Sequence, residues 1–346
     1  MLQLVIPGLF ASIQALPGTD ASRLSALSLL NERGSKSARE DDGVEALLCR
    51  QFGIRRQTDW PLAAISYVFD DGRAGSDYWL RADPTHIQIH RDKLILLDEL
   101  DISADEAQAL CDSLVSHFGD AFAPLPMQPD RWYLRVPDDP RITTTPLSLA
   151  LGRHIDPLLP RGDGAMHWRK LLNEVQMLLF DHPVNRARES RGLPAINSLW
   201  LWGGGTLPAA PDVPSKTAFY GRDFTARAIA KFSSAAAHAL PENWHPGIDD
   251  ASLCLLDPLN RCWRNNDMAG WIAALNNIES GWIAPLMKAG KTFSVDDPDG
   301  GTSLTWRSLD RWKFWRRSEK AARRENDLPS LSPGYYTGMD EFGNRY

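Results

Sequence analysis

The sequence predicts an α/β fold with more than one domain. Its opening run LQLVI, residues 2 to 6, is apolar and is stopped by Pro7 and Gly8, which indicates a buried strand. Residues 22 to 34 space leucines at helical intervals and close on a glycine, which indicates a helix. A strand followed by a helix is typical of an α/β layer. A chain of 346 residues with 43% hydrophobic content can bury one large core or two moderate ones.

The next elements indicate a change of architecture near Trp60. Before it, the polar SKSAREDDG at 35 to 43 predicts a loop, and EALLCRQFG predicts a second helix. After it, THIQIHRDKLILL predicts two strands joined by a tight turn. Ser103 and Glu106 fit a capping box that begins a helix, and WYLRV at 132 to 136 predicts a further strand. Residues 60 to about 165 therefore predict a compact α+β module.

The second half begins with a long amphipathic helix, HWRKLLNEVQMLLFDH, which should end before Pro183. INSLWLW, at 196 to 202, predicts a strand, and three glycines follow it. These glycines predict either a turn or a loop whose N–H groups approach an anion. Short strands and helices then alternate to about residue 317. The polar segment from Ala321, rich in Gly and Pro, predicts a mobile terminus.

Composition and charge exclude several classes of function. The formal net charge of -6 and pI near 5.8 argue against nucleic-acid binding through a general basic surface. A basic, aromatic run begins at Trp306, and it is equally compatible with a packed element covered by Arg stems. The N-terminal run lacks a basic region and is too short to span a membrane, so we expect a cytoplasmic protein without membrane contact. Four cysteines without C-x-x-C spacing predict reduced, structural thiols.

One cluster of polar residues has the spacing of an anion site. His182, Asn185 and Arg188 lie at i, i+3 and i+6 across a helix break, so their side chains could converge on one small anionic group. The alternative is that His182 and Asn185 cap two helices and Arg188 is solvated.

Metal-binding patterns are weak in this sequence. Its eight histidines are scattered, and the best pairing, Asp163 with His167 beside Asp156, lacks converging partners. We therefore expect neither a metal site nor another cofactor.

A long motif resembles a known family. The segment HPVNRARESRGLPAINSLWLWGGG, residues 182 to 205, resembles the H-P-V-N-x-x-R and G-x-x-P-A-N-x-x-W-L-W-G-Q-G pattern of archaeal-type cofactor-independent phosphoglycerate mutases. The strand pair and the I-S-x-x-E-A helix start near residue 102 resemble the domain inserted in those enzymes. The chain is also similar to a bacterial group described as regulatory proteins of the pathogenicity-factor E type.

The resemblance implies an alkaline-phosphatase-like fold. In that superfamily an α/β sheet flanked by helices carries two divalent metals and a nucleophilic serine, and a smaller inserted α+β domain closes over the substrate. Carried over here, it implies a discontinuous core of residues 1–59 and 166–320, an inserted domain of residues 60–165, and a mobile tail at 321–346.

The family's catalytic residues do not carry over. Pro7 stands where the family has a metal-binding aspartate, and Trp271 stands where its late ligand motif ends in histidine. Gly204 replaces a glutamine, and Ser25 and Ser28 lie outside the nucleophile pattern. Two-metal phosphoryl transfer depends on such ligands. The resemblance therefore implies a degenerate, regulatory relative, and no catalytic residue is assigned.

The motif positions that survive predict a binding site for a small phosphorylated acid. Its candidate residues are His182, Asn185, Arg188, Asn197, Trp202, Gly203 and Gly205. On this interpretation, Arg188→Ala should abolish ligand binding and leave the fold intact. A protein partner is also expected for a regulatory protein. Two alternatives stay open, an active phosphoglycerate mutase with an altered metal site and an interaction scaffold whose cleft is filled.

Overall fold

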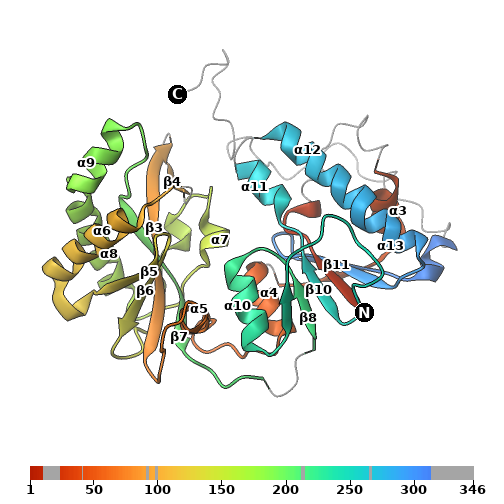
Figure 1. The fold of residues 1–346 in the computed structure, drawn as a ribbon, viewed down its shortest axis with the longest axis horizontal. Helices are drawn as coiled ribbons and strands as arrows, with labels where there is room; N and C mark the ends of the chain where they lie inside the picture. Colours follow the sequence, from red (N-terminus) through yellow and green to blue (C-terminus); the bar gives the residue numbers. More distant parts are fainter. Residues whose placement is uncertain are drawn as a thin grey trace, which may run out of the picture.

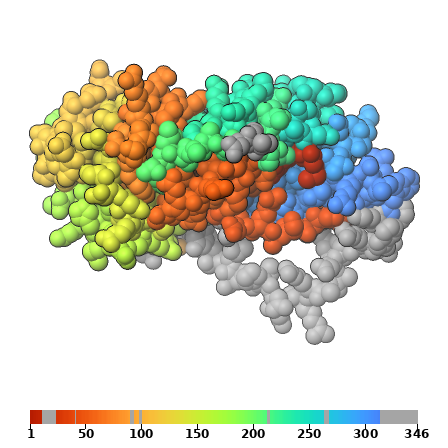
Figure 2. Space-filling view, turned by 90° about the horizontal axis from the view of Figure 1, so that it is seen from below, coloured from red at the N-terminus to blue at the C-terminus, as the bar shows by residue number. Residues whose placement is uncertain are grey.

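The computed structural model describes residues 1–10, 24–40, 42–90, 93–97, 100–211, 215–264 and 267–312. These residues form two lobes, each built on its own sheet (Figure 1). Figure 2 shows the lobes at opposite ends of an elongated body. The strands are β1 Leu2–Val5, β2 Ser35–Ala38, β3 Tyr78–His90, β4 Lys93–Leu97, β5 Pro124–Gln128, β6 Arg131–Val136, β7 Ser198–Thr206, β8 Ala218–Tyr220, β9 Ala236–His238, β10 Ser252–Leu255, β11 Phe293–Asp297 and β12 Thr302–Trp306.

The α-helices alternate with these strands, so the predicted mixed α/β class is confirmed. They are α3 Ser25–Arg33, α4 Gly43–Gln51, α5 Leu62–Phe69, α6 Ala104–Phe118, α7 Leu147–Ala150, α8 Ala165–Phe180, α9 Pro183–Ser190, α10 Phe224–Phe232, α11 Pro258–Arg264, α12 Met268–Asn277 and α13 Ala284–Lys288. A π-helical turn, Ile278–Ile283, joins α12 to α13. Short 3₁₀ turns occur at Gly119–Ala121, Asp156–Leu158 and Ser308–Trp312.

The first lobe is a seven-stranded sheet in the order β2-β12-β11-β1-β10-β8-β9. Its centre is parallel: β1 pairs with β10 and β11, and β10 pairs with β8. All four residues of β1 are buried, as its unbroken apolar run predicts. Leu2 and Leu4 pack in the cluster that includes α3 and α12, whereas Val5 packs in the cluster that includes α4 and α10. Helices therefore cover both faces of this sheet.

One predicted loop is instead an edge strand. The polar residues of β2 pair antiparallel with β12, and three of the four are exposed. A polar sequence of this kind is compatible with an edge strand because only one side of it needs a partner. The prediction of a loop over residues 35 to 43 was therefore wrong for Ser35–Ala38. Local sequence propensity cannot indicate pairing with a strand more than 250 residues away.

The second lobe is a smaller α+β unit in the strand order β4-β3-β6-β5, with β7 paired to β3. The predicted strand pair and the strand at 132 to 136 are confirmed as β3, β4 and β6. The capping box is confirmed as well: Ser103 accepts a hydrogen bond from the Glu106 N–H, and Glu106 accepts one from the Ser103 N–H. Helices α6 and α8 contribute to the core of this lobe.

The second lobe extends beyond the residue 165 boundary that the sequence suggested. Helix α8 packs its buried leucines, Leu171, Leu172 and Leu179, in the same cluster as β3 and α6. Strand β7 pairs with β3 from Tyr78↔Thr206 to Thr85↔Ser198. The structure therefore groups residues up to Thr206 with the second lobe, while the expected tail from residue 321 lies outside the described residues.

The three glycines lie within strand β7 rather than after it. Gly203 has a φ of +70°, and the β3–β7 register shifts between Trp79 and Arg81 opposite this region. A residue with left-handed backbone conformation next to a register shift is a feature of β-bulges. Glycine is common at such positions because it adopts this conformation without steric strain. The expected turn, or anion-binding loop, is therefore an internal irregularity of a paired strand.

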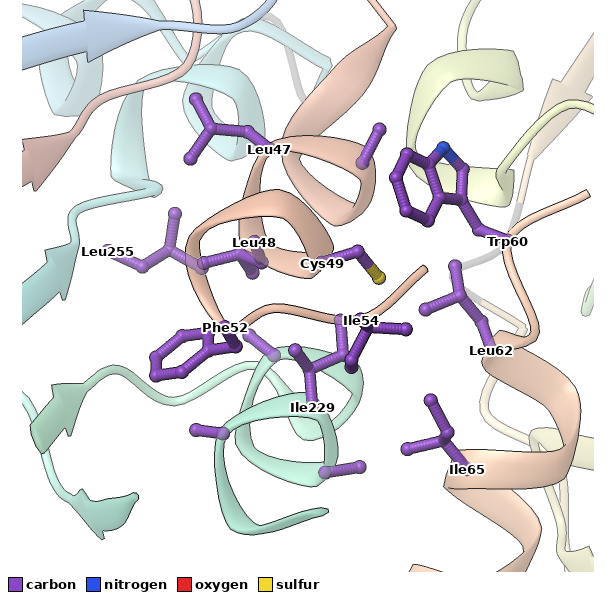
Figure 3. Close-up of a cluster of buried hydrophobic side chains, with 14 of the residues drawn as sticks. Leu47, Leu48, Cys49, Phe52, Ile54, Trp60, Leu62, Ile65, Ile229 and Leu255 are labelled. Carbon is purple, nitrogen blue, oxygen red and sulfur yellow. The ribbon is translucent and has the colours of Figure 1, made fainter. Parts of the chain in front are cut away.

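A hydrophobic cluster joins the two lobes (Figure 3). Helix α4 contributes Leu48, and α10 of the same lobe contributes Ile229. Opposite them lie Trp60, at the end of the linking segment, and Leu62 and Ile65 of α5. Trp200 and Trp202 of β7 belong to the same cluster. Apolar burial at this junction fixes the faces of the two lobes that oppose each other.

Two further expectations concern thiols and membranes. All four cysteines are free, and three of them are buried, in agreement with structural thiols. Within the described ranges, no helix has both the length and the apolar character needed to cross a bilayer.

Candidate functional site

The candidate site is a cavity of about 370 Å³ between the two lobes. The first lobe contributes residues that follow the carboxyl ends of its parallel strands: Pro7 after β1, Asp257 after β10 and Asp299 after β11. Open α/β sheets bind ligands at this edge. The second lobe closes the cavity with residues of β3, β6, α7 and β7. Its volume lies in the range of small-molecule sites.

Arg81 and Asp83 form a buried ion pair at the second-lobe wall. They lie at i and i+2 on β3, so their side chains share one face. Arg81 donates to Asp83 Oδ1 from Nε at 3.0 Å and from Nη2 at 2.8 Å. Trp202 donates from Nε1 to Asp83 Oδ2 at 2.7 Å, and the Arg81 guanidinium lies 5.1 Å from the Trp202 ring centroid. Arg81 is 3% exposed, and its Nη1 has no hydrogen-bond partner among the described residues.

Arg131 connects the second lobe to the first. It donates to both carboxylate oxygens of Asp70 at 3.0 and 3.1 Å. Tyr133 donates its hydroxyl proton to the same carboxylate at 2.6 Å. The Arg131 guanidinium lies 3.8 Å from the ring centroid of Phe224, which begins α10. This cation–π contact crosses the interface beside the cavity.

Carboxylates dominate the first-lobe wall. Glu45 lies on α4 and accepts a hydrogen bond from the Ser148 hydroxyl at 2.8 Å. Burial, with the negative charge of Asp223 as the next cause, raises the pKa of Glu45 to about 7. Asp223 is the N-cap of α10 and accepts from the Ala226 N–H at 2.7 Å. Asp223 is exposed to solvent, and partial desolvation of its carboxylate by the surrounding protein atoms raises its pKa.

Replacing Glu45 by Gln should stabilise the fold above neutral pH. A pKa near 7 in the folded state, against 4.5 in the unfolded chain, means that ionised Glu45 disfavours folding. This cost is absent below the lower value, grows as the pH rises between the two, and is complete above pH 7. The expected gain for Glu45→Gln is up to about 3 kcal/mol at pH 8. Urea unfolding at pH 8 and pH 4.5 measures it, and the gain should vanish at the lower pH.

The matched control for this prediction is Glu40→Gln. Its side chain is 77% exposed and pairs with Arg50, so this change removes one negative charge outside the core. It should produce no comparable pH-dependent difference. Equal behaviour of the two variants would contradict the assignment of a neutral-range pKa to Glu45.

The structure places His182 at a helix start, outside the lining of the cavity. It is the N-cap of α9, and its Nδ1 accepts a hydrogen bond from the Val184 N–H. Burial lowers its pKa, which favours the neutral ring. With Nδ1 as acceptor, the proton is on Nε2, which then donates to Ser113 Oγ at 2.8 Å. In this tautomer His182 cannot take a proton from Ser113. Ser113 and His182 therefore do not form a catalytic pair of nucleophile and general base.

Two asparagines of the predicted set bind backbone groups. Asn185 donates to the carbonyls of Leu179 and Ile196 and accepts from the Ile196 N–H. Asn197 accepts from the Ile87 N–H and donates to the Ile87 carbonyl. Both residues thus fix the connection between α9 and β7 against its neighbours. Neither lines the cavity.

Arg188 is also held by the chain itself. Its side chain is fully buried, pairs with Glu106 at 2.8 Å and donates to the carbonyls of Leu100, Asp101 and Pro194. The sequence left Arg188 either in an anion pocket or solvated, and the structure shows it in neither environment. These partners use all three nitrogens of the guanidinium.

Trp202 alone among the seven predicted residues lines the cavity. Gly203 donates its N–H to Thr144 Oγ1 at 3.1 Å. Gly205 lies against Pro61, where a Cβ would come within 2.6 Å of the proline Cβ. The glycines therefore permit close packing of β7 on the start of α5.

The charged residues of the cavity were missed by sequence reasoning. Arg81 and Asp83 occur in YWLRADP, where two opposite charges interrupt a run that otherwise has strand character. Charges two residues apart on one strand face are a usable signal for a buried pair. Glu45, Asp223 and Asp299 carry no comparable sequence signal, because they come from three separate segments.

The metal donors of the resembled family are not matched by the residues at two key positions. Pro7 follows β1 and lines the cavity without a ligand atom in its side chain. Trp271 is 2% exposed and packs in the core of the first lobe. Over the described residues, no group of three or more His, Cys, Asp or Glu side chains has the proximity needed to hold a metal ion.

Comparison with known proteins gives a partial similarity. No protein-family model matches the chain. A segment of 67 residues is 43% identical to the 2,3-bisphosphoglycerate-independent phosphoglycerate mutase of Methanothrix thermoacetophila, and it covers 19% of this chain and 17% of that enzyme. A segment of 110 residues is 31% identical to the enzyme of the same name from Methanosarcina barkeri, covering 31% and 28%. The matched parts thus span less than a third of these relatives.

Two solved structures resemble larger parts of the chain at low identity. The cofactor-independent phosphoglycerate mutase from Thermoplasma acidophilum aligns over 88% of this chain and 89% of its own, with 18% identity and a TM-score of 0.37. A protein from Pyrococcus horikoshii aligns over 88% and 87%, with 12% identity and a TM-score of 0.46. At these TM-scores the likeness defines no shared activity.

Proposed function

We propose that the chain binds a small phosphorylated acid in the cavity between its lobes and acts as a regulatory, metabolite-binding protein without mutase activity. The observation that carries this proposal is the second-lobe wall, where Arg81 lies buried with an unpaired Nη1. Arg153 lines the same cavity, and its exposed side chain has no ion-pair partner among the described residues. Guanidinium groups suit phosphate and carboxylate oxygens because their N–H donors form a planar fork.

The residues at the strand ends support binding rather than phosphoryl transfer. Two-metal transfer needs ligands that hold both ions beside the reacting phosphate. Pro7 and the buried Trp271 replace an aspartate and a histidine of the resembled family, so the donor set at these positions does not fit two divalent metals. The local similarity to phosphoglycerate mutases supports the ligand class. A regulatory protein of this kind would bind a protein partner with different affinity in its ligand-bound and ligand-free forms.

The test is thermal stability with 3-phosphoglycerate, with and without manganese. Ligand at about 100 times its dissociation constant should add roughly 2.7 kcal/mol of stability. We expect this stabilisation without manganese, and no conversion to 2-phosphoglycerate in a direct assay. Stabilisation that requires manganese, accompanied by conversion, would instead establish an active mutase. No stabilisation in either condition would contradict the proposal and favour an interaction scaffold.

Paired arginine variants locate the bound molecule. Arg153→Gln removes a cavity guanidinium and should weaken 3-phosphoglycerate binding about tenfold. Arg186→Gln is the control, because Arg186 of α9 is 63% exposed, pairs with Asp181 and does not line the cavity. Equal affinity of both variants and the unmodified protein would place the ligand elsewhere.

A further inference from the structure

The two walls of the cavity differ in charge. On the first-lobe wall carboxylates outnumber guanidiniums, since Glu45, Asp223, Asp257 and Asp299 are accompanied by Arg261. On the second-lobe wall Arg81 pairs with Asp83 and Arg131 pairs with Asp70, so Arg153 is the guanidinium there that has no ion-pair partner among the described residues. A simple anion would be attracted to one wall and repelled by the other. The charge pattern therefore restricts the ligand more narrowly than the arginines alone do.

The carboxylates of the first-lobe wall are close enough to repel one another. Asp223 and, more weakly, Asp299 add to the effect of burial in raising the pKa of Glu45. Asp257 acts in the same direction on Asp223. Asp299 accepts a hydrogen bond from Asn260 Nδ2 at 2.7 Å, so the repulsion that a bound cation would relieve is greatest between Glu45 and Asp223.

The opposite wall lies within electrostatic reach. Arg81 lowers the pKa of Asp223 across the cavity, although burial outweighs this effect. Arg81 supports a ligand independently of the acidic wall, because it lines the cavity, is 3% exposed and leaves Nη1 without a hydrogen-bond partner among the described residues. Because residues of both walls line the same cavity of about 370 Å³, one small molecule can contact both walls.

We propose that the ligand carries a positively charged amino group as well as its acidic group. The acidic group lies against Arg81 and Arg153, and the amino group lies against Asp223 and its neighbouring carboxylates. The ligand class is thus a small phosphorylated amino acid or amino alcohol. This inference rests on the proposed function, since it assumes a phosphorylated ligand in the same cavity.

The experiment compares two compounds that differ at one position. O-Phosphoserine has an ammonium group where 3-phosphoglycerate has a hydroxyl, and both enantiomers are tested because the orientation in the cavity is not assumed. Isothermal titration calorimetry in buffer with a chelator should show about tenfold tighter binding of at least one enantiomer. Equal or tighter binding of 3-phosphoglycerate overturns this inference and leaves the proposed function standing. No binding of any of the compounds contradicts the proposed function itself.

A charge-neutral variant tests where the amino group binds. Asparagine caps helices as well as aspartate does, so Asp223→Asn keeps the hydrogen bond to the Ala226 N–H while removing the charge. It should reduce the preference for O-phosphoserine to about threefold or less. Asp250→Asn is the control, since Asp250 is 60% exposed, pairs with Lys291 and lies outside the cavity lining. An unchanged preference in Asp223→Asn overturns the assignment of the amino group to this wall.

Discussion

Arg188→Ala is expected to lower the free energy of unfolding by about 3 to 5 kcal/mol. The side chain is fully buried, and its removal leaves Glu106 without one of its cationic partners. It also removes the donors to the carbonyls of Leu100, Asp101 and Pro194, and the Leu100 carbonyl is left unpaired in a buried position. The expectation from sequence, that this substitution spares the fold and abolishes ligand binding, is therefore replaced by a loss of stability.

The control is Arg191→Ala, which removes the second cation bound to Glu106. Arg191 is 55% exposed and donates to Glu106 Oε1 at 2.5 Å. An exposed pair of this kind contributes less than about 1 kcal/mol. Chemical denaturation of both variants separates the two cases. A loss for Arg188→Ala no larger than that for Arg191→Ala would show that the buried contacts do not stabilise the protein.

Much of the fold follows from local pattern. The apolar run of β1 predicts a strand buried on both faces, and the Ser103 and Glu106 pair predicts the start of α6, because both signals lie within a few adjacent residues. Strand β2 could not be predicted in this way. Its polar residues are strand only through pairing with β12, and that partner is determined by the tertiary fold.

The site was harder to predict because the same sequence pattern is compatible with two different structural roles. An arginine beside a capping residue is what an anion site needs, and it is also what a buried helix junction needs. Arg188 takes the second role because residues 100 and 101 bring their carbonyls to it, and nothing near Arg188 in sequence indicates this. Similarly, Arg81 and Glu45 meet at one cavity only because β3 and α4 belong to different lobes that pack together.

The second large effect is expected at Asp83. It is 1% exposed and accepts hydrogen bonds from Arg81 and from Nε1 of Trp202. Asp83→Asn removes the charge that balances Arg81 and places an amide donor against one of these donors. Because the variant leaves a buried guanidinium uncompensated, we expect a loss of about 3 to 5 kcal/mol in the free energy of unfolding.

The neighbouring pair Asp77 and Arg135 supplies the control. Their side chains are 44% and 65% exposed and 3.4 Å apart, so Asp77→Asn should cost less than about 1 kcal/mol. A double variant, Arg81→Met with Asp83→Asn, removes the uncompensated cation and should recover part of the stability lost in Asp83→Asn alone. No recovery would mean that the loss comes from the hydrogen bonds that Asp83 accepts from Trp202 Nε1 and the Trp132 N–H, and not from Arg81. Recovery would confirm that Asp83 compensates the buried charge of Arg81 at the cavity wall.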